Sequence, residues 1–250
     1  MRCFYLYRIG FFLSVLFFNT FLSADWNYHF LEKEGARQKV NAPAFLQLEH
    51  AVIAHLENSW CSEEKARLLM ELTLLEKPSI CVEIGVFTGS TLLPVAATLK
   101  YLQKGKVYAI DPWSNEEAIK NCSELDPNIA WWQTLDMKAV FRSFLQMHRK
   151  WRLKSFCEVL KQPSKEVASI FEATSIDFLH IDGNYSEEGS LEDVALFLPK
   201  VRSGGYVLYS NFPWVVNGIQ TRREALQKLL DSCEIVSIID DRSSFLLRKF

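Results

Sequence analysis

The stretch VEIGVFTGST, residues 82–91, sets Glu83 two places before Gly85 and places a second glycine, Gly89, four positions later. It ends the apolar run SICVEI and precedes a helical pattern that continues to about Gln103. Gly85 lets the backbone turn tightly and approach a ligand without a Cβ in the way. Free N–H groups at the start of the following helix favour an anion. The stretch therefore predicts a strand-to-helix turn that binds a small charged ligand, although a plain tight turn gives the same pattern.

From residue 79 to the C-terminus, short apolar runs alternate with stretches of helical periodicity, which is typical of an α/β fold with a doubly wound parallel sheet. The predicted strands are SICVEI, KVYAID, SFCEVLK, IDFLHID, GYVLYS, EIVSIID and SFLLRK. The last two meet at a turn around Asp240, Asp241 and Arg242, which is too short for a parallel crossover. The last strand is therefore predicted to run antiparallel. Helices are expected between the strands, among them residues 164–173 and 218–232.

The first 24 residues differ in kind from the rest. Arg2 and Arg8 precede the apolar run FFLSVLFFNTFLSA, which ends in the small residue Ala24. This order is typical of a secretory signal peptide, and the run is shorter than the ~20 residues that cross a bilayer. We expect residues 1–24 to be a signal peptide, with a membrane anchor and a buried helix as alternatives. The protein would then be exported (periplasmic or secreted) or membrane-anchored, and cytoplasmic if the leader is not used.

Helical periodicity also marks residues 42–58 and 62–77, with Ser62 as a helix start and Pro78 as a stop. We therefore expect residues 25–78 to form an N-terminal helical extension, which could be a cap or a homodimer face, before a domain spanning residues 79–250. The 28 basic and 30 acidic residues leave no electrostatic footprint for nucleic acid. The cysteines after the leader have no spacing typical of a metal site or a disulfide framework.

Polar residues follow the second and third strands. Asp111 ends VYAID, where a carboxylate can accept hydrogen bonds from both hydroxyls of a ribose. Because Pro112 follows, Asp111 is also a candidate helix N-cap; Trp113 comes next. Ser164, in QPSKEVA, is a candidate ligand residue or a plain helix cap. Asp111 lies one strand–helix–strand unit after the glycine turn, which favours a nucleoside-containing ligand.

The most specific stretch is IDFLHIDGNYSEEGSLEDVALFLPKVRSGGYVLYSNF, residues 176–212. It resembles the segment D-x-x-[FH]-I-D-G-x-H-x-Y-E-x-x-x-x-D, followed by L-x-x-G-G, of a broad family of small-molecule methyltransferases. With this motif and the antiparallel C-terminal hairpin strand, the chain from about Ser79 resembles the Rossmann-like (class I) S-adenosylmethionine-dependent methyltransferases. The resemblance implies six parallel strands and one antiparallel strand, helices on both faces, and a methyltransferase domain at residues 79–250.

The resemblance also implies that S-adenosylmethionine is the cofactor. Glu83 would meet its ammonium, directly or through water, Asp111 its ribose and Asp182 its sulfonium. The residues expected to bind the cofactor are Glu83, Gly85, Phe87, Gly89, Ser90, Asp111, Pro112, Trp113, Ser164 and Asp182.

The chain departs from the family pattern at the site of the chemistry. Tyr185 stands where the family usually has His, and Ser210 and Asn211 replace an acidic pair. A divalent metal site, for which Asp182 and Asn211 are the candidates, is therefore weakened or absent. We expect Asp182 and Tyr185 to be the catalytic residues, although Tyr, with a reference pKa of ~10, is a poor base. His180 lies inside its predicted strand, which favours a structural role.

Together these motifs predict an enzyme that transfers a methyl group from S-adenosylmethionine to a small-molecule acceptor, at oxygen. Trp131 and Trp132 could stack an aromatic, lipid or sugar acceptor, or pack within an excursion helix. One alternative is a non-catalytic exported binding protein built on the methyltransferase fold. Another is a dinucleotide oxidoreductase, which the missing G-x-G-x-x-G pattern disfavours.

Overall fold

A computed structural model describes residues 31–56, 60–240 and 242–250 of the chain. Within them lies a seven-stranded sheet in the order β3-β2-β1-β4-β5-β9-β8. β9 pairs antiparallel with β5 and β8, while the other paired strands run parallel, which confirms the predicted sheet and its C-terminal hairpin. The strands are β1 (Ile80–Ile84), β2 (Lys106–Ile110), β3 (Cys157–Leu160), β4 (Ile176–Ile181), β5 (Val201–Tyr209), β8 (Cys233–Ile239) and β9 (Ser244–Lys249).

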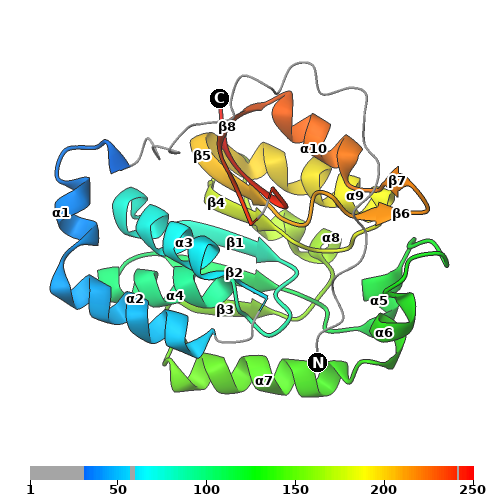
Figure 1. Cartoon of the computed structure of the whole chain (residues 1–250), viewed down its shortest axis with the longest axis horizontal. Coiled ribbons are helices and arrows are strands. Elements are labelled where there is room, and N and C mark those ends of the chain that lie inside the picture. The colour runs from blue at the N-terminus through cyan, green and yellow to red at the C-terminus, as the bar shows by residue number, and fades with distance from the viewer. Residues whose placement is uncertain (1–30, 57–59, 241) are drawn as a thin grey trace.

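Helices cover both faces of the sheet (Figure 1). Along β1, Cys81 and Val82 point to opposite faces, as alternate residues of a strand do, and each belongs to a separate core. The core around Cys81 is built with α1 (Ala36–Val40), α2 (Pro43–His55), α3 (Glu63–Glu76), α4 (Leu92–Leu102) and α7 (Met137–Lys150). The core around Val82 is built with α8 (Ser164–Val167), α9 (Glu187–Phe197) and α10 (Arg223–Leu230).

Two short helices, α5 (Asn115–Ile119) and α6 (Ile129–Thr134), lie beyond the ends of β1 and β2, on the right of Figure 1. They come from the long stretch between β2 and β3, and none of their residues is fully buried. Side chains of α5 and α6 are therefore available to line a site at the carboxyl ends of these strands.

Two predicted helices differ from the structure. The helix expected at residues 164–173 is cut to α8 and a 3₁₀ turn, Ala168–Ile170, because Phe171 leaves the helix to pack edge-on against Tyr108, 5.1 Å between ring centroids. The helix expected at residues 218–232 begins only at Arg223. Before it, β6 (Val215–Val216) and β7 (Ile219–Gln220) form a hairpin around Asn217 and Gly218. Both turn residues have positive φ, as an Asn-Gly hairpin requires.

The leader predicted at residues 1–24 lies outside the described residues. In the part of the chain that the structure does describe, no helix has the length and apolar character needed to cross a membrane. Export of the protein and formation of a homodimer stay predictions.

Helix α3 confirms the predicted start at Ser62, whose hydroxyl accepts a hydrogen bond from the Lys65 N–H at 3.0 Å. The same helix is joined to the β8–β9 turn by an ion pair between Lys65 Nζ and Asp240 Oδ2, at 2.5 Å. The two side chains are only 6% and 15% exposed, so neither charge is well solvated. The Ser62 hydroxyl also donates to Asp240. The C-terminal hairpin is thereby fastened to α3.

We expect Lys65→Met to lower the free energy of unfolding by about 3–5 kcal/mol, because it leaves the Asp240 carboxylate, which is only 15% exposed, without its ion-pair partner. Urea unfolding followed by circular dichroism measures this loss. Lys33→Met is the matched control, since it removes the exposed ion pair between Lys33 and Glu76 and should cost less than about 1 kcal/mol. Equal losses in the two variants would contradict the assignment. Lys65→Met combined with Asp240→Asn should recover most of the stability.

Candidate functional site

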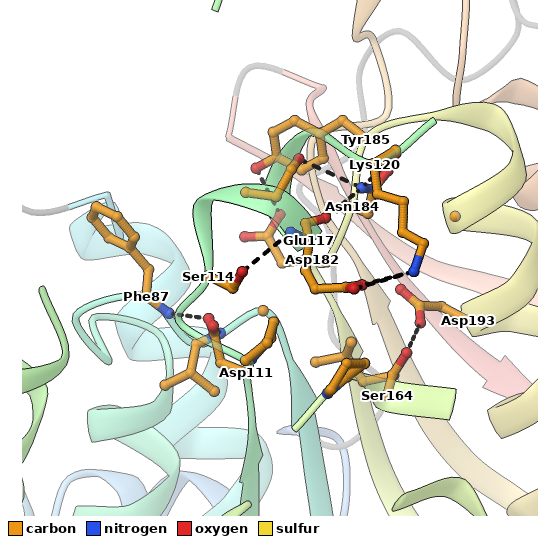
Figure 2. A pocket seen from close by; sticks show the side chains of 18 of the residues that line it. Phe87, Asp111, Ser114, Glu117, Lys120, Ser164, Asp182, Asn184, Tyr185 and Asp193 are labelled. Carbon is orange, nitrogen blue, oxygen red and sulfur yellow. Dashed lines mark hydrogen bonds and ion pairs between the residues drawn. The ribbon is translucent and has the colours of Figure 1, made fainter. Parts of the chain in front are cut away.

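A cavity of about 220 Å³ opens at the carboxyl ends of β1, β2 and β4 (Figure 2). The turns after these strands line it, as expected for a ligand site in an open α/β sheet. Most of the predicted site residues reach it: Gly85, Phe87, Ser90, Asp111, Pro112, Ser164, Asp182 and Tyr185. Segments that are far apart in the sequence are thus brought to one place.

Gly85 sits where two strand ends approach closely. Its φ is +82°, and a Cβ added to it would lie 2.1 Å from the backbone oxygen of Asp182, so a side chain here collides with the neighbouring turn. The Gly85 N–H also donates to the Ile110 carbonyl, at the end of β2. A residue with a side chain therefore does not fit between the turns that carry Asp111 and Asp182, whereas glycine does.

The Asp111 carboxylate joins two turns. Oδ2 accepts hydrogen bonds from the N–H groups of Val86 and Phe87, both at 2.9 Å, and Oδ1 accepts from the Trp113 N–H at 2.6 Å. Burial raises the pKa of Asp111, and the three N–H groups oppose that rise. Asp111 does not cap α5, because that helix starts later and its N-cap is Ser114.

Three of the predicted cofactor residues lie behind the cavity wall. Glu83 is 2% exposed, Gly89 lies under the α7 side chains, and Trp113 is 5% exposed. The Trp113 ring packs against Phe141 and Phe144 of α7, and its Nε1 donates to the Phe87 carbonyl. These residues shape the turn that carries the cavity without lining it.

The buried Glu83 carboxylate accepts a hydrogen bond from Thr91 Oγ1 at 2.6 Å. Thr91 is the N-cap residue of α4, and with its hydroxyl turned to Glu83, no side chain among the described residues caps that helix. Ser90 and Thr91 both line the cavity. Within α4 itself, the Leu93 N–H already donates to the Gly89 carbonyl and Pro94 has no N–H, so this end of the cavity can receive an anionic ligand group through Ser90 and Thr91.

At the other end, Asp182, Tyr185 and Asn211 form a hydrogen-bonded cluster. Asn211 Nδ2 donates to Asp182 Oδ1 at 2.7 Å and to the Tyr185 hydroxyl at 2.9 Å, and that hydroxyl lies 3.2 Å from Asp182 Oδ1. Burial and the Asp182 charge hold the pKa of Tyr185 well above its usual value. Tyr185 is therefore neutral at physiological pH and can orient a ligand but not act as a base.

These residues do not fit a divalent metal ion. Asp182 is the one carboxylate in the cluster, and the Asn211 amide nitrogen faces it. Ser210 turns away from the cavity toward His180 Nε2, at 2.9 Å, and Lys65 Nζ, at 3.5 Å. Among the residues that the structure describes, no group of three or more His, Cys, Asp or Glu side chains could hold a metal ion.

Ser164 and Asp193 close the cavity floor. The Ser164 hydroxyl donates to Asp193 Oδ1 at 2.5 Å, and the N-cap of α8 is Pro163 rather than Ser164. Asp193 Oδ2 lies against Gly183, where a Cβ would be 2.6 Å away. Burial raises the pKa of Asp193 to about 6.

The roof of the cavity was not predicted. It is the segment of α5 that contributes Ser114, Glu117 and Lys120, and Figure 2 shows these residues above the cavity. Asn184 fixes the roof, because its Nδ2 donates to the Glu117 carbonyl at 3.0 Å and to the Lys120 carbonyl at 2.9 Å. The sequence carries no periodic signal for this contact, since it joins a loop after β4 to the last turn of a five-residue helix.

The sequence profile of a family described as "Methyltransferase domain" matches residues 82–212, just over half of the chain. The chain belongs to this family. The matched segment runs from β1 to the residue after Asn211 and so contains the glycine turn, Asp111 and the Asp182 cluster. A search of curated proteins finds no significant match.

Solved structures share the fold of this methyltransferase-domain protein. A Corynebacterium glutamicum protein is similar with a TM-score of 0.57 and 14% identity, over 89% of this chain and 96% of its own. The O-methyltransferase TomG of Streptomyces achromogenes, in complex with S-adenosylmethionine, is similar at 0.54 and 16%, over 81% and 89%. An O-methyltransferase of Bacillus cereus, in complex with S-adenosylhomocysteine, is similar at 0.53 and 16%, over 89% and 96%.

The cavity of this methyltransferase-domain protein is acidic. Its described lining residues include the carboxylates of Asp111, Glu117, Asp126, Asp182, Glu188, Glu192 and Asp193, against the ammonium groups of Lys120 and Lys165. A cleft lined by one sign of charge concentrates ligands of the opposite sign. The cavity therefore favours a ligand with net positive charge.

Asp193→Asn should change how stability depends on pH. Because the pKa of Asp193 is raised in the folded protein, this group stabilises the fold when protonated, and the contribution is lost as pH rises from about 4 through about 6. Relative to the wild type, Asp193→Asn should therefore gain up to about 3 kcal/mol in unfolding free energy between pH 4 and pH 7.5. Urea unfolding at both pH values measures this. Glu187→Gln, at an exposed position on the same helix α9, should show no such gain, and a similar gain in both variants would contradict the assignment.

Proposed function

We propose that this protein transfers the methyl group of S-adenosylmethionine to an oxygen atom of a small-molecule acceptor. One observation carries the proposal: the cavity sets Ser90 and Thr91, just before α4, against a surrounding set of carboxylates. S-adenosylmethionine has a carboxylate, an ammonium and a sulfonium, so it combines one anionic group with net positive charge. Family membership and the fold shared with cofactor-bound O-methyltransferases support the same assignment.

The residues present fit this cofactor. Ser90 and Thr91, at the start of α4, would receive its carboxylate, and Ser164 would lie toward its adenine. A carboxylate has about four acceptor positions, and Asp111 uses three on backbone N–H groups, so it retains capacity for a ribose hydroxyl. Asp182 would lie near the sulfonium. Glu83 is too deeply buried to meet the cofactor directly, and it would act by holding Thr91.

The bound cofactor would supply both the methyl group and the leaving group. The protein's part is to align the acceptor and exclude water. Asn211 and Tyr185 hold the Asp182 carboxylate at the cavity wall, and the neutral Tyr185 hydroxyl can orient an acceptor oxygen. Asp182 would take the acceptor's proton. Neither the family nor the solved neighbours support a non-catalytic exported protein.

Calorimetric titration of the full-length chain with S-adenosylmethionine and with S-adenosylhomocysteine tests the proposal. Asp182→Asn should weaken binding of S-adenosylmethionine about tenfold, or about 1.4 kcal/mol, and leave S-adenosylhomocysteine nearly unchanged, because only the former carries the sulfonium charge. Asp177→Asn, at the opposite end of β4, is the matched control and should alter neither affinity. If the folded protein binds neither compound, or if Asp182→Asn weakens both equally, the assignment is wrong.

A further inference from the structure

Four aromatic side chains from three separate segments converge beside the cavity. Trp60 precedes α3, Phe87 lies in the turn after β1, and Trp131 and Trp132 belong to α6. We call these four residues the aromatic wall. Ring centroids of Trp60 and Trp131 are 5.6 Å apart with planes at 21°, and Trp60 lies 5.5 Å from Phe87. Trp132 meets Phe87 edge-on at 6.1 Å.

Contacts with the rest of the protein bury only part of the aromatic wall. Trp60, Phe87 and Trp132 line the cavity, and the side chains of Trp60 and Trp131 are 57% and 39% exposed. Trp113, from the same end of the sheet, is only 5% exposed, because α7 covers it. Isolated exposed apolar residues are ordinary, but two stacked indoles at the mouth of a cavity form a contiguous apolar surface of the kind that binds ligands. An aromatic ring placed against such a surface gains favourable ring–ring interaction in addition to the apolar area that it buries.

The cavity wall that carries Asp182 is polar, but it offers few groups that could act as a general base. It contains Asp182 and the neutral Tyr185, both of which accept hydrogen bonds from Asn211. Among the described residues that line the cavity there is no histidine. A phenol, with a pKa of ~10 as in tyrosine, gives up its proton far more easily than a hydroxyl that resembles water, at ~15.7. A carboxylate such as Asp182 is therefore better matched, as a general base, to a phenol than to an aliphatic alcohol.

The charge of the cavity narrows the acceptor further. The carboxylates of its lining outnumber its ammonium groups, as described above, so an acceptor with a carboxylate or phosphate of its own would be repelled. The acceptor must enter without negative charge.

We propose that the acceptor is a neutral, planar compound with a hydroxyl on an aromatic ring, bound with the ring against the aromatic wall and the hydroxyl toward Asp182. This inference rests on the proposed function and names the substrate class of the same site. In the reaction the bond between sulfur and the methyl carbon breaks, with its electron pair left on sulfur, and a bond between the phenol oxygen and that carbon forms. The phenol proton passes to the Asp182 carboxylate and then to solvent.

The test compares matched acceptors on the full-length chain with S-adenosylmethionine. Phenol, catechol and 2-naphthol are set against cyclohexanol, trans-1,2-cyclohexanediol and 2-decalol, and 3,4-dihydroxybenzoate is the negatively charged counterpart of catechol. Mass spectrometry follows the methyl ethers and S-adenosylhomocysteine. We expect methylation of aromatic members, at least tenfold slower methylation of their saturated counterparts, and at least tenfold weaker use of the charged compound than of catechol.

Two Trp variants test whether the acceptor's aromatic ring lies against the aromatic wall. Trp60→Leu should raise KM for the aromatic acceptor about tenfold while changing kcat and the affinity for S-adenosylmethionine little, whereas Trp151→Leu, which removes an indole packed on His55 away from the cavity, should change none of them. A protein that binds the cofactor but methylates no aromatic member, or methylates the saturated compounds equally well, overturns this inference and leaves the proposed function standing. An unchanged KM in Trp60→Leu also overturns it. Loss of cofactor binding itself would instead defeat the proposed function.

Discussion

The cavity depends on the Asp111 carboxylate, which accepts hydrogen bonds from the N–H groups of Val86, Phe87 and Trp113. These bonds join the turn after β1 to the turn after β2, so both turns take one fixed shape at the same edge of the sheet. The carboxylate is buried to achieve this, and its raised pKa shows that the N–H groups do not fully offset the loss of water. Perturbed carboxyls of this kind gather at functional sites. Gly85 completes the arrangement, because a larger residue would collide with the turn that carries Asp182.

A buried line of polar groups supports the same turn from behind. Glu83 and His180 are register partners on β1 and β4, and His180 Nδ1 lies 3.4 Å from Glu83 Oε2. His180 Nε2 continues to Ser210, and Ser210 lies near Lys65, which pairs with Asp240. These polar groups therefore connect the turn before α4 to helix α3 and to the C-terminal hairpin. His180 thus has a structural role, as its position inside a strand suggested. Ser210 precedes Asn211 in the sequence, but its hydroxyl contacts buried polar groups and not the cavity.

Much of the fold was predictable because strand and helix periods alternate regularly after residue 79, and because the turn near Asp240 is too short for a crossover. The glycine turn and Asp111 were predictable for the same reason, since their place at strand ends follows from local sequence. Two helices were predicted too long, and each difference has a local cause. Asn217-Gly218 marks a hairpin that helical periodicity does not reveal, and Phe171 leaves its helix to pack on Tyr108. Placement of Trp113 behind the turn depends on α7, which is distant in sequence. The roof held by Asn184 and the aromatic wall likewise arise from side chains that meet only after folding, so no spacing in the sequence announces them.

Hydrogen exchange of the full-length chain, followed by mass spectrometry with and without S-adenosylmethionine, tests most directly whether this cavity is the cofactor site. Three turns should exchange more slowly when the cofactor is present: residues 85–91, residues 111–120 and residues 182–185. Peptides from α2, which packs on α4 and contributes no residue to the cavity lining, should be unchanged. Unchanged exchange in all three turns, or protection confined to another part of the chain, would contradict the assignment of the cavity.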